Sequence, residues 1–333
     1  MPQRIQYSMS KRLLTSLVIM FFFTVPQFAI AQKPDTLIKK LDSLHIQTDS
    51  AGKQKNNIAP EAYNEETKLT PASYFILLGS DFKQTFTKPF HMTKKDWLNT
   101  GGFVLGEVAL SFADEPIQRN VFTWRGESKA VRNTSEYVTR FGASYEIYTL
   151  LTLGTTGFVF HRTKLTTTTF LATQAYLTGA AVEVAVKFLS GRQRPDFYTT
   201  AARVPDPQFH GPFKVIKDFS GNKENSSFPS GHTTVAFAAA TVFAMEYKDH
   251  LLIPIISYSA ATLIGLSRLT ENRHWFTDIV AGAALGYLSG RQVVNNYHRY
   301  AKLKAPQQKK NSVTFNLDYN FGHVMPGLVY TFR

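Results

Sequence analysis

From about residue 72 to residue 295 the chain alternates helix-length apolar stretches with polar loops. The apolar stretches are rich in Ala, Leu, Gly and Val, and they are longer than ordinary strands, which favours helices. The pattern predicts helices at Trp97–Ala113, Ala143–Phe160, Thr168–Leu189, Thr233–Tyr247, Leu251–Ser267 and Ile279–Ser289. We therefore expect an all-α domain over residues 72–300, a helical bundle of about six helices.

Most of these stretches are short for a membrane-spanning helix, which needs about 20 predominantly apolar residues. Residues 233–245 offer 13 uncharged positions and residues 279–290 offer 12. Three other stretches are interrupted by Glu107, Glu146 and Glu183, and buried carboxylates are expensive in lipid. Helix packing in a globular core explains the pattern at least as well, so a full bundle of spanning helices is an alternative that the pattern does not favour.

The N-terminus has the order of a secretory signal peptide. Basic residues up to Arg12 precede an uncharged run from Leu13 to Val25, and the small residues Ala29 and Ala31 follow. We therefore expect residues 1–31 to be a signal peptide and the protein to be exported. An uncleaved membrane anchor is the alternative.

The segments on either side of the helical domain have a different character. Residues 32–71 are polar with few large apolar side chains, which predicts a flexible linker. Residues 301–333 form a basic segment and a predicted β-hairpin. Alternation with polar residues is seen at Val313, Phe315, Leu317, Tyr319 and Phe321, and Met325-Pro326-Gly327 is a turn signal. The hairpin is expected to cap the helical domain, although such alternation also occurs in outer-membrane strands.

Composition and charge narrow the classes of function. The chain is 44% hydrophobic and 18% charged, which favours a helical core or membrane contact over disorder. Its net charge of +13 favours anionic partners such as phosphates and acidic lipid surfaces. The sequence has no zinc-finger spacing, aromatic single-strand platform or basic groove-binding helix, so nucleic acid is not expected as a partner. Because cysteine is absent, disulfides, thiolate catalysis and cysteine metal sites are excluded.

The first motif with chemical potential is Lys187-Phe-Leu-Ser-Gly-Arg-Gln-Arg194-Pro195. Lys187 ends an apolar helix and Arg194 lies in the loop after it. An ammonium and a guanidinium at this spacing can converge on one phosphate, where arginine adds a planar two-point contact. Alone, the motif is a weak signal, because a basic helix end followed by a loop is usually a solvated face.

The second motif is Ser226-Ser-Phe-Pro-Ser230-Gly231-His232, and an apolar helix follows it directly. Backbone N–H groups at a helix start, with Gly231 allowing close approach, form a site for anions. His232 is placed to exchange a proton with a bound phosphoester. The alternative is a capping serine followed by a surface histidine.

The third motif runs from Ser267 to Asp278 and contains Arg268 and His274. His274 and Asp278 are four residues apart, so both can face one side of a helical turn. A carboxylate on one imidazole nitrogen fixes the tautomer and leaves the other nitrogen as a nucleophile. Arg268 offers a further phosphate contact. A capping pair and a metal site are alternatives, although the basic residues nearby disfavour a cation.

In combination the motifs are much more specific. The order Lys-x6-Arg-Pro, Pro-Ser-Gly-His, Ser-Arg-x5-His-x3-Asp resembles the type 2 phosphatidic acid phosphatase/vanadium haloperoxidase superfamily. The three motifs match in full over residues 187–278, and the helical pattern extends the resemblance to about residues 72–295. The leader, the linker and the tail lie outside it.

The resemblance implies a role for each matched residue. His274 attacks phosphorus and is oriented by Asp278, while His232 protonates the leaving oxygen and then assists water. The phosphate and its developing charge are held by Lys187, Arg194, Ser230, Gly231 and Arg268. No metal or other cofactor is needed for this hydrolysis, because the cationic side chains supply the positive charge.

The function expected from the resemblance is that of a bacterial exported phosphatase. Its substrates would be phosphomonoesters or pyrophosphates, chiefly of lipids, and the reaction would pass through a phosphohistidine intermediate. Two alternatives stay open: a vanadate-dependent haloperoxidase that uses the same pocket, and a non-catalytic envelope protein.

The location of the site follows from a topological argument. In the membrane members of the superfamily the chain enters the first core helix from the cytoplasm, and the active site faces outward. Here the leader would place residue 70 outside, so six spanning helices would put the loop of Arg194 in the cytoplasm. We therefore expect a periplasmic or membrane-associated domain with its active site on the exported side. Trp97, Trp124 and Lys94-Lys95 are candidates for contact with a lipid surface.

Overall fold

The computed structural model describes residues 69–142, 144–198, 207–217, 221, 224–304, 312–320 and 323–331. The predicted signal peptide over residues 1–31 lies outside the described residues, as does almost all of the predicted linker over residues 32–71. The prediction of a signal peptide and a flexible linker therefore stays a prediction.

The described part of the chain is mostly helical. Its α-helices are α3 (Pro71–Thr87), α4 (Lys94–Ser111), α5 (Asp114–Glu127), α6 (Lys129–Val138), α7 (Ser144–Val159), α8 (Thr163–Ser190), α9 (Gly231–Glu246), α10 (Leu252–Thr270) and α11 (Phe276–Lys304). Short 3-10 helices are η2 (Lys88–His91), η3 (Thr139–Gly142) and η4 (Pro195–Tyr198). The helical character agrees with the sequence prediction.

The predicted count of about six helices is too low, because nine α-helices lie within the described residues. The six predicted stretches correspond to α4 and α7–α11, whereas α3, α5 and α6 were missed. Helices α5 and α6 are polar, so a search for apolar runs passes over them. Their signals are at their ends: Ser128 caps α6 by accepting from the Val131 N–H at 3.3 Å, and α5 begins with Asp114 and Glu115.

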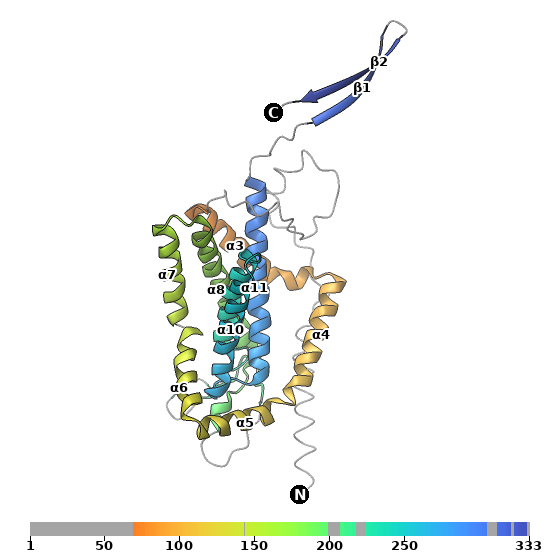
Figure 1. The fold of residues 1–333 in the computed structure, drawn as a ribbon. Helices are drawn as coiled ribbons and strands as arrows, with labels where there is room; N and C mark the ends of the chain where they lie inside the picture. Colours follow the sequence, from red (N-terminus) through yellow and green to blue (C-terminus); the bar gives the residue numbers. More distant parts are fainter. Residues whose placement is uncertain are drawn as a thin grey trace.

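Helices α8, α9 and α11 form the centre of the bundle. Figure 1 shows α8, α10 and α11 running in the same general direction, with α6 and α7 along one edge, α4 along the other, and α5 across one end. The core joins α8, α9 and α11 through the buried side chains of Leu171, Ala172, Ala175, Ala238, Val242, Val293 and Val294. Burial of each large aliphatic side chain stabilises the bundle by about 1.5–3 kcal/mol.

Helices α9 and α11 approach so closely that glycine is required on α11. A Cβ atom on Gly286 would lie 2.2 Å from the Thr234 carbonyl oxygen, and one on Gly290 would lie 2.5 Å from the Ala238 carbonyl oxygen. This contact holds the first turn of α9 beside the first turn of α11. Those two turns carry parts of the second and third motifs.

The outer faces of the bundle remain rich in apolar side chains. Leu252, Ile256 and Leu263 of α10 are 70%, 64% and 56% exposed. Among the described residues, α10 is the one helix long and apolar enough to cross a membrane, with 28% of its apolar window buried in the protein. Length and composition alone make it a candidate for lipid contact.

The two strands near the C-terminus pair with each other. Strands β1 (Ser312–Asn320) and β2 (His323–Thr331) run antiparallel, with Ser312 opposite Thr331 and Asn320 opposite His323. Met325–Gly327 therefore lies within β2, opposite residues 316–318, and not at the turn where the sequence placed it. That the pair caps the helical domain stays a prediction.

Candidate active site

The three motifs meet at one end of the bundle. Lys187 lies in the last turn of α8 and Arg194 in the loop after it, while Gly231 and His232 begin α9. Arg268 lies in the last turn of α10, and the loop after it leads through His274 to Asp278 in the first turn of α11. The chain leaves α8 at Gly191, the residue that caps the C-terminus of this helix and has φ 53°. A side chain would be strained in this left-handed conformation.

His274 is almost completely buried and has one hydrogen-bonded nitrogen. Its Nδ1 lies 2.7 Å from the carbonyl oxygen of Ser227 and 3.5 Å from Oδ2 of Asp278. Since a carbonyl oxygen only accepts, Nδ1 must carry the proton and Nε2 keeps its lone pair. Within the described residues no hydrogen bond occupies Nε2. The imidazole is thus oriented first by a backbone carbonyl, whereas the sequence had pointed to Asp278 for this role.

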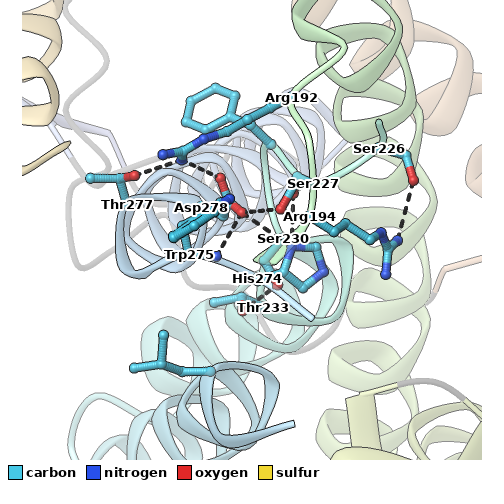
Figure 2. Close-up of polar contacts among 12 residues, drawn as sticks. Arg192, Arg194, Ser226, Ser227, Ser230, Thr233, His274, Trp275, Thr277 and Asp278 are labelled. Atoms are coloured by element: carbon cyan, nitrogen blue, oxygen red, sulfur yellow. Dashed lines mark hydrogen bonds and ion pairs between the residues drawn. The ribbon is translucent and has the colours of Figure 1, made fainter. Parts of the chain in front are cut away.

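Asp278 instead ties the segments of the site together. Its Oδ2 accepts from the Ser227 hydroxyl at 2.5 Å and from the Trp275 N–H at 2.9 Å. Its Oδ1 accepts from Nη1 of Arg192 at 2.5 Å, as the dashed lines of Figure 2 show. These bonds fix the carboxylate of Asp278 beside His274, where its negative charge faces the imidazole.

Arg192 lies between two buried carboxylates. Its Nη1 donates to Asp278, and its Nη2 donates to Asp114 at 2.5 Å. Its guanidinium also packs over the rings of Phe209 and Trp275, at 4.9 and 5.6 Å from the ring centroids. Burial opposes the charge of Arg192, but the carboxylates of Asp278 and Asp114 outweigh burial and raise its pKa above the ordinary value. The guanidinium is therefore a permanent buried cation.

Asp114 links this group to the start of α11. Its Oδ1 accepts from the Thr277 N–H at 2.9 Å, and its Oδ2 accepts from the Thr277 hydroxyl at 2.6 Å. Because Asp114 is the first residue of α5, this contact fastens one end of α5 to the site.

Lys187 reaches the first residue of α9. Its ammonium forms an ion pair with Glu183, one helical turn earlier on α8. A Cβ atom on Gly231 would lie 2.7 Å from Oε1 of Glu183 and 3.3 Å from Nζ of Lys187. Because Gly231 has no side chain, the ammonium of Lys187 can lie close to the N-terminus of α9.

Arg194 and Arg268 bond to hydroxyl groups and, among the described residues, to no carboxylate. Arg194 Nη2 donates to the Ser226 hydroxyl at 3.3 Å, and Arg268 Nη1 donates to the Thr139 hydroxyl at 2.7 Å. Across the part of the chain that the structure describes, neither arginine forms an ion pair, and the Nε of each is buried without a hydrogen bond. Partly buried guanidinium groups without an ion-paired carboxylate favour the binding of an anion.

The two imidazoles lie in the field of these cations. Burial and, after it, the charges of Arg268, Lys187 and Arg194 together lower the pKa of His232 to about 3. Burial, followed by the same cations, also holds the pKa of His274 well below the ordinary value. Both imidazoles are therefore neutral in the absence of an anion.

Ser230 contributes its hydroxyl rather than its N–H to the site. Its N–H donates to the Asp278 carbonyl oxygen at 2.9 Å, so it is already used. Its hydroxyl oxygen accepts from the Thr233 hydroxyl at 2.9 Å, which leaves the Ser230 hydrogen available for another acceptor. The N-terminus of α9 begins at the next residue, Gly231.

Comparison with known proteins gives the same family as the motifs. A model described as the PAP2 superfamily matches residues 167–301. The lipid A 1-phosphatase of Rhizobium johnstonii is 30% identical over 176 residues, which cover 48% of this chain and 67% of that protein. The chain belongs to the PAP2 superfamily.

Other PAP2 relatives match over shorter parts. The lipid A 1-phosphatase of Porphyromonas gingivalis is 46% identical over 66 residues, 20% of this chain and 15% of that protein. Lipid phosphate phosphatase 1 of Arabidopsis thaliana is 32% identical over 172 residues, 42% of this chain and 50% of that protein. The chain thus spans half or less of the length of these two relatives.

The PAP2 match contains all eight residues predicted for the site, but not their whole surroundings. The structure gathers those eight residues at one end of the bundle, and it adds Arg192, Glu183, Asp114 and Thr139, which sequence reasoning did not select. Arg192 and Glu183 lie within residues 167–301, whereas Asp114 and Thr139 lie upstream of that segment.

The added residues left different signals in the sequence. Arg192 stands two positions before Arg194, and nothing in the sequence indicates that its side chain is buried. Glu183 precedes Lys187 by one helical turn, a spacing typical of an ion pair. Asp114 had no signal beyond its place at a polar helix start.

Proposed function

We propose that this chain is a phosphatase that hydrolyses phosphomonoesters or pyrophosphates of lipids through a phosphohistidine intermediate at His274. One observation carries the proposal most directly. Lys187, Arg194 and Arg268 surround two neutral imidazoles, and both arginines lack a carboxylate partner within the described residues. A phosphate group would supply the missing negative charge.

In the first step, Nε2 of His274 attacks phosphorus. The Nδ1–H continues to donate to the Ser227 carbonyl, and the imidazole gains positive charge as the bond between Nε2 and phosphorus forms. The carboxylate of Asp278, 3.5 Å from Nδ1, stabilises this charge. Lys187, Arg194 and the N-terminus of α9 hold the phosphoryl oxygens.

His232 serves the leaving group and then the water. A bound phosphoester brings negative charge, which opposes the cations and raises the pKa of His232, so that it can carry a proton. His232 gives this proton to the leaving oxygen as the ester bond breaks. It then takes a proton from water, whose oxygen attacks phosphorus and releases inorganic phosphate and free His274.

Two features favour a lipid substrate at a membrane. The relatives are named lipid A 1-phosphatase and lipid phosphate phosphatase. In addition, Phe188 and Leu189, which follow Lys187 directly, are 53% and 54% exposed and offer an apolar surface beside the site. The proposed location is periplasmic or membrane-associated, with the active site on the exported side.

The test is phosphate release from a panel of lipid and soluble phosphoesters by the full chain in detergent. The expected result is release by the wild type and a loss of at least about 1,000-fold in His274→Ala, because the nucleophile is removed. His250→Ala, at the exposed turn between α9 and α10, serves as the matched control and should keep wild-type activity.

Trapping of the intermediate tests the mechanism itself. Rapid quenching with labelled substrate should give a phosphoenzyme that is stable in alkali and labile in acid, that is absent in His274→Ala, and that accumulates in His232→Ala. Phosphate release that survives His274→Ala would refute the assignment of the nucleophile. Bromide oxidation with added vanadate, in the absence of phosphate release, would replace the proposed phosphatase with a haloperoxidase.

A further inference from the structure

Three buried charged side chains form a network next to His274, the proposed nucleophile. Asp114, Arg192 and Asp278 are 0%, 1% and 0% exposed, and the two nitrogens of the guanidinium fork bind one carboxylate each at 2.5 Å. Two anions and one cation leave a net charge of −1. Asp278, the member of this group nearest to His274, lies 3.5 Å from its Nδ1.

The position of Asp114 determines how much of this charge reaches His274. If Arg192 paired with Asp278 alone, the two would form a neutral pair. That pair would exert little net electric field on the imidazole of His274. With Asp114 on the other nitrogen of the fork, the charge of Arg192 is shared between two carboxylates, so less of the charge of Asp278 is cancelled. In a buried site such differences are only partly screened.

The remaining charged groups do not change this balance. Lys187, Arg194, Arg268 and His232 face His274 from α8, the following loop, α10 and α9, and all are positive or neutral. Glu107 of α4 faces the three charges, but burial first, and then the charge of Asp114, raises its pKa to about 8. At neutral pH it is largely uncharged.

We propose that Asp114 is a positioning residue for the nucleophile: it offsets the charge of Arg192 and so lets Asp278 stabilise the positive charge that develops on His274. The inference rests on the proposed phosphatase function. It assigns a role to a residue of α5 that lies outside the PAP2 match and contacts neither His274 nor the phosphate site.

A purely structural role makes a different prediction. Asp114 also accepts two hydrogen bonds from Thr277, so it fastens the start of α11. If that were its only role, replacement of Asp114 would loosen the whole site, and every ligand would bind more weakly. If its charge matters, only ligands that bond to the imidazole should be affected.

The experiment compares orthovanadate with inorganic phosphate as inhibitors of the full chain. Vanadate imitates the transition state and bonds to the imidazole nitrogen, whereas phosphate is held by the cations. In Asp114→Asn we expect kcat and vanadate affinity to fall together, by about 10- to 100-fold, while phosphate affinity changes less than about twofold. Glu115→Gln is the matched control, since it removes the neighbouring charge of α5, which pairs with Arg119 at 2.5 Å.

A double variant gives an independent measure. Asp114→Asn with Arg192→Gln removes one charge of each sign and keeps the net charge at −1, and Asp278 retains its bonds from Ser227 and Trp275. We expect kcat of the double variant to lie within about tenfold of wild type and above that of Asp114→Asn. This comparison with wild type holds even if Asp114→Asn alone does not fold.

Three outcomes would overturn the inference. These are wild-type kcat and vanadate affinity in Asp114→Asn, an equal loss of vanadate and phosphate affinity in that variant, and a loss of more than tenfold in a folded double variant. Failure of the proposed function looks different, because the wild type itself would then release no phosphate or His274→Ala would remain active.

Discussion

The close contact between α9 and α11 can be tested with a single methyl group. In Gly286→Ala, the new Cβ would lie 2.2 Å from the Thr234 carbonyl oxygen, 2.8 Å from Cβ of Phe237 and 2.9 Å from the amide nitrogen of Ala238. Two of these atoms belong to the backbone of α9 and cannot rotate away. Since ordinary contact begins at 3.4 Å, the helices must separate by about 1 Å at this point.

The expected cost follows from two opposing contributions. Overpacking of a well-packed core costs about 1–3 kcal/mol, and a backbone contact belongs at the upper end of that range. Alanine in place of glycine inside a helix returns about 0.5–1 kcal/mol. Gly286→Ala should therefore lower the free energy of unfolding by about 2 kcal/mol.

Chemical unfolding in detergent, followed by circular dichroism, measures this difference. Gly106→Ala is the matched control, because Gly106 lies inside α4 with nothing within 4 Å of its Cβ position, and this variant should be slightly more stable than wild type. If Gly286→Ala is as stable as Gly106→Ala, the helices are not in the contact described. A fall in kcat should accompany the loss of stability, because α9 carries His232 and α11 carries Asp278.

Three further predictions concern the site. The pKa of His232 is about 3 in the folded state and about 6.5 in the unfolded state, so the unfolded state binds more protons between these two pH values. The free energy of unfolding should therefore fall as the pH falls from 6.5 to 3, by up to about 1.4 kcal/mol per pH unit. Unfolding of His232→Asn over this range should show a shallower slope, and an equal slope would contradict the shift. Ser227→Ala removes the buried hydroxyl that donates to Asp278 but keeps the backbone carbonyl that orients His274. In unfolding experiments it should lower the free energy of unfolding by about 1–3 kcal/mol. In steady-state assays it should reduce kcat far less than His274→Ala does. Phosphate release should be unchanged within about twofold by EDTA, and a large loss that added metal restores would contradict the metal-independent mechanism.

The sequence could bring the chemical groups of the site together, because the three motifs in combination are much more specific than any one of them alone. Lys187, Arg194, His232, Arg268 and His274 lie together at one end of the bundle. The long apolar helices were also predictable, since their periodicity and length reflect burial in the bundle. The catalytic roles of the five site residues remain part of the proposed function.

The supporting network could not be predicted in the same way. Asp114 and Arg192 are 78 positions apart, and nothing in either local sequence indicates the other. The orientation of His274 by the Ser227 carbonyl involves a backbone atom, which has no signature in side-chain patterns. Likewise the turn signal at Met325–Gly327 did not mark a turn, because the register of β1 and β2 places these residues within a strand.

The attachment of α5 to the site has a practical consequence for anyone who shortens this protein. A fragment limited to residues 167–301 would keep every motif residue and would still look complete by alignment. It would nevertheless leave Arg192 with one carboxylate instead of two, and Arg268 without the Thr139 hydroxyl. The smallest active piece should therefore begin upstream of Asp114.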